Sequence, residues 1–393
     1  MTALPGTLTI IADDLTGAAD AAGSYGGRSS AIVLDSAACW PTADIVAVDT
    51  ESRYLSPEGA AERVAAAVHR SLAQQRPVFK KIDSLLRGHI GVEVAAALAA
   101  LGGQDRGLAV VAPAFPATGR TTVGGIVHID GAPNAAGRHG GDVAHALREA
   151  GLRVGVLRPR AEDTAEHLAA DLERARADGL DAVVVDAVDD DDLERIARAT
   201  ELLTGTCLPT GSGGLAAHML RESSDGLTPA PSRGGAERVL IVVGSYSGVA
   251  RSQVDELVRS GATLVEVARL TDGGLVPLLE DLGIGGDVVL TPELLAPIEK
   301  DNALDVAAAL AATASRNAHL FGALVLTGGE TARAVLDTLQ IDRLRVHGAL
   351  EPGVVLSSHP DVGPLLVTKA GAFGDTHTLA RIARSLRDPL NEE

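Results

Sequence analysis

Two adjacent carboxylates, Asp13 and Asp14, directly follow the apolar stretch Leu8–Ala12. An apolar run, two acids and a Thr-Gly-Ala turn over Thr16–Ala18 predict a strand that ends at the acids and a helix that begins after them. Ligands of open parallel sheets bind just beyond the carboxyl ends of the strands, so both acids lie where chemistry is done. Neighbouring carboxylates repel each other unless a metal, a cation or a shared proton relieves them. The pair is therefore a candidate catalytic site, and a helix N-cap beside a solvated acid is the alternative.

A second cluster of charged and hydroxyl side chains follows the apolar stretch Val78–Ile82. Its members are Lys80, Lys81, Asp83, Ser84 and Arg87. A forked guanidinium grips a carboxylate, an ammonium adds a point charge, and short carboxylate and hydroxyl side chains pair with hydroxyl groups. The cluster predicts binding of a small, acidic and hydroxylated molecule. The alternative is a strand-to-helix turn on the surface whose charges compensate one another.

Three further segments of the first half carry weaker signals. Ala112–Thr122 is rich in Pro and Gly and predicts an irregular loop, whose final residues Arg120, Thr121 and Thr122 would face a substrate. A single histidine two residues from an aspartate, as at His128 and Asp130, is more often structural than metal-binding. No set of metal ligands is predicted from the sequence. Gly211–Ala216 is a glycine-rich entrance to a helix, which either exposes backbone N–H groups to an anion or fits the helix closely to a sheet.

Three strand-to-loop transitions of the second half are rich in glycine and hydroxyl residues. They are Gly244–Gly248, Thr327–Thr331 and Lys369–Asp375. Glycine lets the backbone approach a ligand closely, and hydroxyl groups and free helix N–H groups pair with phosphate oxygens. None of the three matches the phosphate loop with Gly-Lys-Ser/Thr or the dinucleotide pattern Gly-x-Gly-x-x-Gly. Three such turns in one domain nevertheless favour a nucleotide site over a purely structural role.

The elements that position these motifs are short apolar runs alternating with amphipathic segments. Their continuous apolarity favours parallel strands covered on both faces. Helices are predicted over Pro57–Gln74 and Gly91–Leu101. The predicted strands are Leu8–Ala12, Ala31–Leu34, Ile45–Asp49, Val78–Ile82, Leu108–Ala112, Arg153–Leu157, Ala182–Val185, Arg238–Val243, Leu320–Leu326, Val354–Leu356 and Leu365–Thr368.

The domain organisation follows from length and from one polar segment. A chain of 393 residues is too long for one ordinary core, so two domains are expected. The segment Ser223–Glu237 is polar and rich in Pro and Gly, which makes it the best boundary. The sequence therefore predicts an α/β fold with two domains, residues 1–228 and 238–393, each a mostly parallel sheet flanked by helices.

Composition narrows the class of protein. Hydrophobic residues make up 46% and aromatic residues 2%, a mixture that suits alternating strands and helices. A net charge of −18 without a basic block argues against nucleic acid or an anionic membrane as partner. Cys39 and Cys207 form no metal or redox motif, and no apolar run reaches the roughly 18 residues of a membrane span. A cytoplasmic protein is expected.

The motifs together resemble those of the four-carbon acid sugar kinases, in the same order and over nearly the whole chain. The resemblance implies ATP-dependent phosphorylation of a threonate, erythronate or 3-oxo-tetronate type of acid. It also implies that residues 1–228 bind the acid and residues 238–393 bind the nucleotide. The matching segments are Ala12–Ala18, Lys80–Ser84, Arg87–Gly88, Ala112–Pro116, Gly119–Arg120, Gly244–Ser247, Gly328–Thr331 and Lys369–Gly374.

The resemblance also implies roles for individual residues. The expected partners are two small molecules, the sugar acid and ATP, and assembly into a homo-oligomer is left open. Mg²⁺ would bridge the ATP phosphates. The residues implied to contact ATP are Ser245 or Ser247, Gly328, Gly329, Glu330, Thr331 and Gly371.

On this reading Arg87, with Lys81 or Lys80, would hold the carboxylate of the acid, while Asp83 and Ser84 would meet its hydroxyls. Asp14, or else Asp13, would accept or orient the proton of the attacking hydroxyl. Phosphoryl transfer depends mainly on alignment and charge neutralisation. Because it follows a glycine-rich turn, Asp375 is a rival proton acceptor.

Two other classes of function stay open at this point. A nicotinamide-linked oxidoreductase of hydroxy acids would share the α/β pattern, although the first strand ends in Asp-Asp where a glycine fingerprint belongs. A non-catalytic sugar-acid-binding protein would keep the acid-binding cluster but would have little need for three phosphate-type turns.

Overall fold

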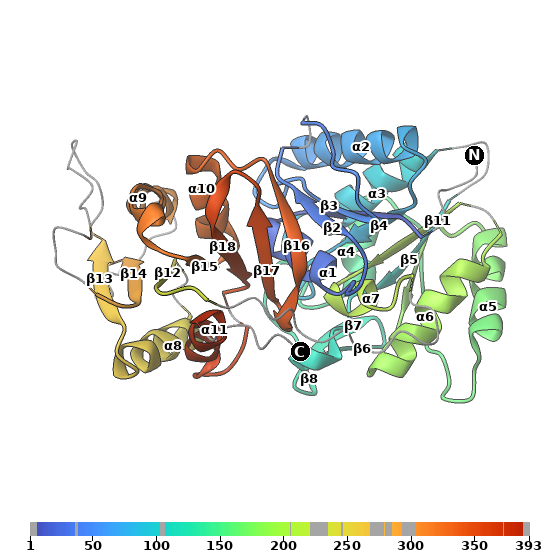
Figure 1. Cartoon of the computed structure of the whole chain (residues 1–393). Helices are drawn as coiled ribbons and strands as arrows, with labels where there is room; N and C mark the ends of the chain where they lie inside the picture. The colour runs from blue at the N-terminus through green and yellow to red at the C-terminus, as the bar shows by residue number, and fades with distance from the viewer. Residues whose placement is uncertain are drawn as a thin grey trace. The chain divides into compact units, whose positions relative to one another are not determined.

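The computed structural model describes residues 6–35, 38–102, 107–204, 206–220, 235–244, 247–267, 279, 285–292, 303–371 and 373–387. The chain divides into two compact units, Met1–Thr228 and Pro229–Glu393, here called the N-terminal and C-terminal units (Figure 1). Each is an α/β structure, as predicted. None of the helices in the described ranges is long and apolar enough to cross a membrane.

A parallel sheet forms the centre of the N-terminal unit. Its described strands follow the order β2-β3-β1-β4-β11-β5-β10-β9. Every residue of β1 and β5 is buried, which explains why these strands read as continuous apolar runs. The strands are β1 (Leu8–Ala12), β2 (Ser30–Val33), β3 (Ile45–Asp49), β4 (Val78–Lys81), β5 (Leu108–Ala112), β9 (Val154–Leu157), β10 (Ala182–Val185) and β11 (Cys207–Gly211).

Helices cover this sheet. α2, α3 and α4 pack in one row, and α1, α7, α6 and α5 pack in another. The first row shares a core with the sheet, in which Val64 and Leu147 pack with Ile11, Val48 and Val111. The helices are α1 (Leu15–Gly23), α2 (Pro57–Ala73), α3 (Ile90–Leu101), α4 (Val143–Glu149), α5 (Ala165–Ala177), α6 (Asp190–Leu202) and α7 (Gly213–Ala216).

The segment after β5 differs from the sequence prediction of an irregular loop. A short 3-10 turn, η1 (Pro116–Thr118), leads into an antiparallel sheet of β6 (Arg120–Val123), β7 (Ile126–Ile129) and β8 (Ala132–Pro133). Gly124 and Gly125 have φ angles of 65° and 76°, the left-handed conformation that a two-residue hairpin turn requires. The prediction was wrong from Arg120 onward, because this glycine pair closes a hairpin.

The C-terminal unit contains a mixed sheet with the order β13-β14-β12-β15-β18-β17-β16 in its described part. The strands from β13 to β18 in this order are parallel, and β17 and β16 add an antiparallel meander. The strands are β12 (Val239–Val243), β13 (Thr263–Val267), β14 (Val288–Pro292), β15 (Ala323–Thr327), β16 (Arg343–Glu351), β17 (Val354–His359) and β18 (Val362–Lys369).

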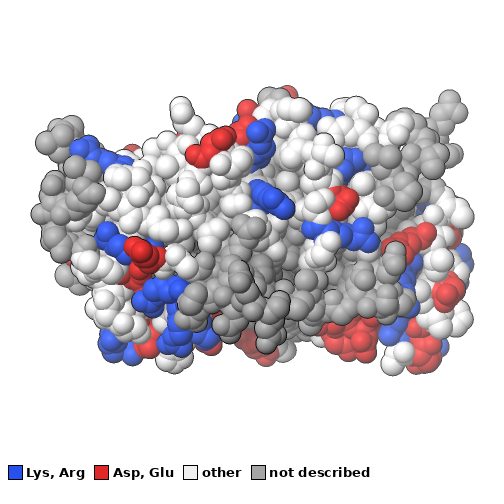
Figure 2. Space-filling model, viewed as in Figure 1, with Lys and Arg blue, Asp and Glu red and all other residues white. Residues whose placement is uncertain are grey.

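Helices again pack on this sheet. α8 and α11 lie against each other, as do α9 and α10. They are α8 (Gly248–Arg259), α9 (Ala303–Asn317), α10 (Gly329–Thr338) and α11 (Thr378–Arg387), with a 3-10 turn η4 (Ala318–Leu320) after α9. Figure 2 shows acidic and basic side chains interspersed on the face in view, and among its described residues no extended basic patch.

Candidate functional site

The carboxyl ends of neighbouring parallel strands meet at one edge of the N-terminal sheet. Ala12, the last residue of β1, pairs with Asp49, the last residue of β3. Gly211 of β11 pairs with Lys81 of β4 in the same way. The segments that leave these strands therefore begin side by side, at the edge where open α/β sheets bind their ligands.

Arg53 joins the two adjacent aspartates and was not identified from the sequence. Its Nε lies 2.7 Å from Oδ2 of Asp13, and its Nη1 lies 2.6 Å from Oδ2 of Asp14. Its Nη2 is 3.6 Å from Oδ1 of Asp83. The guanidinium is buried and is thus the cation that relieves the repulsion between the acids.

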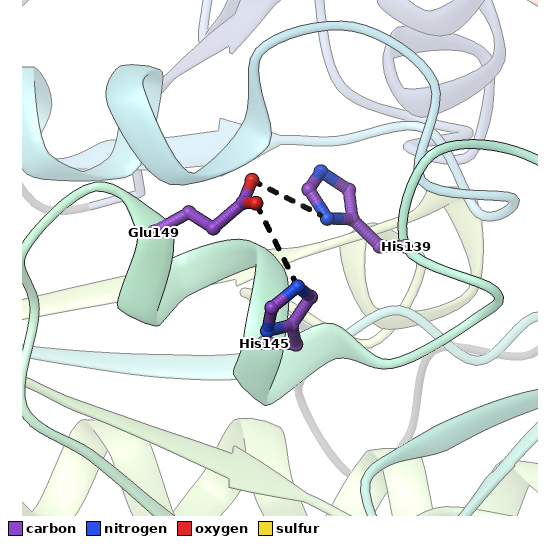
Figure 3. Close-up of side chains that lie close together, drawn as sticks. All are labelled: His139, His145 and Glu149. Carbon is purple, nitrogen blue, oxygen red and sulfur yellow. Dashed lines mark ion pairs between the residues drawn. The ribbon is translucent and has the colours of Figure 1, made fainter.

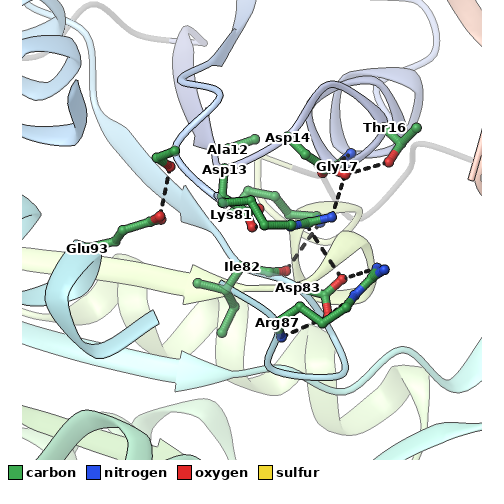
Figure 4. A network of polar contacts seen from close by, with 12 residues as sticks. Ala12, Asp13, Asp14, Thr16, Gly17, Lys81, Ile82, Asp83, Arg87 and Glu93 are labelled. Atoms are coloured by element: carbon green, nitrogen blue, oxygen red, sulfur yellow. Dashed lines mark hydrogen bonds and ion pairs between the residues drawn. The ribbon is translucent and has the colours of Figure 1, made fainter. Parts of the chain in front are cut away.

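Asp14 is the N-cap of α1 as well as a partner of Arg53. Its Oδ1 accepts a hydrogen bond from the backbone N–H of Gly17 at 2.8 Å, and its Oδ2 accepts one from Oγ1 of Thr16 at 2.8 Å (Figure 4). A Cβ on Gly17 would lie 2.7 Å from Oδ1 of Asp14, so glycine lets this carboxylate approach the first turn of α1 closely. The N-cap alternative therefore holds for Asp14, whose side chain keeps 15% of its surface exposed at the strand edge.

Asp13 is buried more deeply. Its Oδ2 accepts from Arg53, whereas Oδ1 is buried and, among the described residues, has no hydrogen-bond partner. Burial alone would raise the pKa of Asp13, but the charges of Arg53 and Lys80 outweigh it and hold that pKa below its ordinary value. Asp13 is therefore an ionised group that orients Arg53.

Lys80 lies beneath the site rather than in it. Its Nζ is 2.8 Å from Oε2 of Glu93 on α3 and donates to the carbonyl oxygens of Ile11 at 3.2 Å and Lys81 at 2.8 Å. These contacts engage all three donors of the ammonium group, and the side chain is fully buried. The sequence predicted that Lys80 contacts the substrate. In the structure its ammonium group instead bonds to the ends of β1 and β4 and to α3.

Lys81 points the other way from Lys80 and lies beside the first turn of α1. Its Nζ donates to the carbonyl oxygen of Ile82 at 3.2 Å and lies 3.1 Å from the position that a Cβ of Gly17 would take. In the described part of the chain this ammonium has no further hydrogen-bond partner, so two donors remain for a ligand.

Asp83 and Arg87 form a bidentate pair within one turn. Nε of Arg87 is 3.0 Å from Oδ2 of Asp83, and Nη2 is 2.6 Å from Oδ1 (Figure 4). Burial raises the pKa of Asp83, but the hydrogen bond and charge of Arg87, with the charge of Arg53, bring it well below its ordinary value. The sequence predicted that the Arg87 fork would grip a substrate carboxylate. In the structure the fork grips Asp83, while 59% of the Arg87 side chain stays exposed.

Ser84 receives a hydrogen bond from Nη1 of Arg120, which is itself buried at the start of β6. This contact ties the small antiparallel sheet to the turn after β4. Because Arg120 stands 36 residues beyond Ser84, local sequence patterns could not reveal the pairing.

The three glycine-rich turns of the C-terminal unit also meet at one sheet edge. Val243 pairs with Thr327, and Thr327 pairs with Lys369, so β12, β15 and β18 end in register. Ser247 caps α8 by accepting from the backbone N–H of Ala250 at 3.1 Å. The structure thus assembles Ser247, Gly328–Thr331 and Gly371, whereas Ser245 and Ala372 lie outside the described residues.

Glycine is required at the first of these turns. A Cβ on Gly244 would lie 1.8 Å from Oγ1 of Thr331 and 2.8 Å from its Cβ. Gly328 has a φ of 94° and precedes α10 without any side-chain cap. Among the described residues no side chain caps the first N–H groups of α10, and such groups suit a phosphate oxygen.

Lys369 is fully buried beneath this edge and places a positive charge there, and Asp375 is paired with Arg381. Nζ of Lys369 donates to the carbonyl oxygens of Ala370 at 3.0 Å and Gly371 at 3.5 Å. Burial lowers the pKa of Lys369 to about 8. Both carboxylate oxygens of Asp375 accept hydrogen bonds from Nη1 of Arg381, at 2.9 and 3.0 Å. Asp375 is therefore poorly placed to accept the proton of a substrate hydroxyl.

Comparison with known proteins adds an independent line of evidence. A family model described as a sugar-binding N-terminal domain matches residues 8–219, and one described as a nucleotide-binding C-terminal domain matches residues 284–379. The chain is 38% identical to a D-threonate kinase of Cupriavidus necator, with 94% of this chain and 95% of the relative covered. It is 34% identical to a D-threonate kinase of Bordetella bronchiseptica, with 96% and 97% covered.

A solved structure from Salmonella typhimurium LT2 has the same fold, with a TM-score of 0.79 and 22% identity. The match covers 97% of this chain and 100% of the other. The two domain models and the relatives of nearly full length point to the same family. The chain therefore belongs to the four-carbon acid sugar kinase family, with a sugar-binding N-terminal domain and a nucleotide-binding C-terminal domain.

Proposed function

We propose that this chain transfers the γ-phosphoryl group of ATP to a hydroxyl of D-threonate. Membership of the family makes it an ATP-dependent kinase of four-carbon acid sugars. The choice of D-threonate among these acids rests on one observation. Two D-threonate kinases share 38% and 34% identity with the chain over nearly its whole length.

The proposed proton acceptor is Asp14. Its side chain is 15% exposed, compared with 4% for Asp13, so a substrate hydroxyl reaches Asp14 more readily. Asp13 then acts as a positioning residue, because its ionised carboxylate fixes the Arg53 guanidinium that also holds Asp14. The transition state of phosphoryl transfer is loose, so orienting the hydroxyl matters more than a strongly basic carboxylate.

The acid is proposed to bind between Lys81 and the turn that follows β4. Lys81 offers two ammonium donors, and Arg87 offers an exposed guanidinium that Asp83 holds in place. Ser84, fixed by Arg120, presents a hydroxyl beside them. Lys80 and Asp83 remain part of the site as the charges that hold its strands and its turn.

ATP is proposed to bind at the glycine-rich edge of the C-terminal unit. The N–H groups that open α10, at Gly329 and Glu330, would meet phosphate oxygens, with Thr331 and Ser247 as hydroxyl partners. The lack of a side-chain cap at Gly328 fits a phosphate group, and Gly244 lets Thr331 of α10 pack closely against the turn. Gly371, Ser245 and the Lys369 ammonium are the remaining groups of the proposed ATP site. Mg²⁺ bound with ATP would neutralise part of the phosphate charge.

The test is ADP release from Mg-ATP by the purified full chain with a panel of four-carbon compounds. The panel consists of D-threonate, L-threonate, D-erythronate and the neutral polyol erythritol. D-Threonate should give the highest kcat/KM, and erythritol should give none. A preference for another acid would contradict the D-threonate assignment alone, whereas activity confined to erythritol would contradict the acid-binding site.

A further inference from the structure

A second cluster of ionisable side chains lies on α4 and the loop that leads into it, and none of its members belongs to the sites above. His139 and His145 both face the carboxylate of Glu149 (Figure 3). Nδ1 of His139 is 3.6 Å from Oε2 of Glu149, and Nε2 of His145 is 3.6 Å from Oε1. The three ligand atoms all lie within 4.8 Å of one another.

We propose that His139, His145 and Glu149 bind a single Zn²⁺ ion. Two imidazoles and one carboxylate are a preferred ligand set for zinc with one coordination position left for water. Ligand atoms about 2.1 Å from a tetrahedral Zn²⁺ are about 3.4 Å from one another. Each imidazole nitrogen lies 3.6 Å from a different oxygen of Glu149, so a carboxylate that binds the ion through both oxygens would bring all three side chains to it. The same separations are too long for good hydrogen bonds.

The His139 nitrogen supplies an independent observation. Its Nδ1 is buried and, in the described part of the chain, has no hydrogen-bond partner. A buried imidazole nitrogen without a partner is costly unless something occupies its lone pair. Because this nitrogen faces Glu149 and the His145 ring lies edge-on at 5.6 Å, a metal ion between the three would satisfy it.

Hydrogen bonds and close packing hold the backbone around the cluster. The carbonyl oxygen of His139 accepts from the backbone N–H of Asp142, and the Asp142 side chain caps α4 by accepting from the N–H of His145 at 2.8 Å. A Cβ on Gly141 would lie 2.8 Å from the carbonyl oxygen of Asn134, so the turn between the two histidines requires glycine and packs closely on its neighbours. His145 and Glu149 stand one helical turn apart on the same side of α4.

One competitor for the carboxylate is present. Nη2 of Arg138 lies 3.2 Å from Oε2 of Glu149, and the Arg138 side chain is 75% exposed. An exposed ion pair contributes little free energy, so Zn²⁺ would displace this guanidinium. Removal of the Arg138 charge should accordingly strengthen binding of the ion, whereas loss of a ligand should weaken it.

The experiment is titration of the metal-free full chain with Zn²⁺ in a calorimeter and with Co²⁺ in a visible spectrometer, without ATP. One ion per chain and the absorption bands of tetrahedral Co²⁺ are expected. His145→Ala, His139→Ala and the nearly isosteric Glu149→Gln should each weaken Zn²⁺ binding at least about 10-fold. Arg138→Ala should bind more tightly, and His69→Ala, an exposed histidine of α2, should bind like the unchanged protein.

Two results would overturn the proposal. One is the lack of any Zn²⁺ binding with a Kd below about 100 μM. The other is binding that survives both His145→Ala and Glu149→Gln, since the ion would then sit elsewhere. Because no nucleotide or acid takes part, either result leaves the kinase proposal untouched.

Discussion

Lys80 and Glu93 form a buried ion pair under the acid-binding edge, with Nζ 2.8 Å from Oε2 and side chains 0% and 2% exposed. The second oxygen of Glu93 accepts from Oγ of Ser52 at 2.7 Å. The pair therefore links β4, α3 and the segment that carries Arg53. Through these bonds the helix α3 fixes the ends of the strands whose following residues form the candidate site.

Breaking this pair should destabilise the protein strongly. Lys80→Met leaves the Glu93 carboxylate buried without its partner, which costs about 3–5 kcal/mol in the free energy of unfolding. Chemical denaturation followed by circular dichroism measures this loss. Glu194→Gln, which breaks an exposed pair with Arg198, is the control and should change stability far less. The double variant Lys80→Met with Glu93→Gln should lose less than the sum of the two single changes. A purely additive result would show that the pair is not coupled.

Asp14→Asn should separate catalysis from nucleotide binding. The amide keeps the shape of the side chain but removes its charge and its capacity to accept a proton, so kcat should fall by roughly 10²–10⁴-fold. ATP affinity, measured by calorimetry, should stay within about twofold, a change of only about 0.4 kcal/mol. A nearly normal kcat would exclude Asp14 as proton acceptor, and Asp13→Asn would then be the variant to measure.

The affinity for ATP should fall as pH rises through about 8. Burial lowers the pKa of Lys369 to about 8, so its ammonium loses the proton between pH 7 and 9. Lys369 is fully buried and would act on the phosphates through its charge rather than by contact, and a loss of about 1.4 kcal/mol corresponds to about 10-fold weaker binding. Calorimetry at several pH values checks this, and Lys369→Met should bind ATP weakly with little dependence on pH. A variant that kept the pH dependence of the unchanged protein would contradict the role of Lys369.

The same group has an opposite effect on stability. The unfolded lysine releases its proton near 10.4 and the folded Lys369 at about 8, so the unfolded chain binds more protons between these values. Its contribution to the free energy of unfolding therefore rises with pH from about 8 to 10.4. Binding and stability thus respond to pH in opposite directions, which separates the two effects in measurement.

A pair of glycine variants tests the phosphate edge. Gly244→Ala introduces a Cβ 1.8 Å from Oγ1 of Thr331 and forces α10 away from the turn, at a cost of about 1–3 kcal/mol. It should weaken ATP binding and leave acid binding unchanged. Gly363→Ala is the control, because Gly363 lies near the start of β18, away from the strand ends, and a Cβ there would meet no described atom within 4 Å. Equal ATP affinities for the two variants would contradict a nucleotide site at this turn.

Continuous apolar runs predicted strands such as Leu8–Ala12 with correct ends, because burial on both faces leaves a local signature. Arg53 and Glu93 were not predicted from the sequence. Arg53 stands 40 residues from its partner Asp13, and Glu93 stands 13 residues from its partner Lys80. Only strand pairing and helix packing bring these residues together. The hairpin at Gly124 did carry a local signal, a Gly-Gly pair between β-branched residues. The pairing of Arg87 with Asp83 could not be predicted from residue types, because a substrate carboxylate and the Asp83 carboxylate form the same pair with a guanidinium.

The most direct measurement is ³¹P nuclear magnetic resonance of the full chain turning over Mg-ATP with D-threonate. Kinase activity predicts that the γ-phosphate signal of ATP disappears as ADP forms, while a phosphomonoester signal coupled to protons of the sugar acid grows in equal amount. Inorganic phosphate in place of that phosphomonoester would mean that the chain hydrolyses ATP without transferring the phosphoryl group to the sugar acid. That result would contradict the proposed function at its centre.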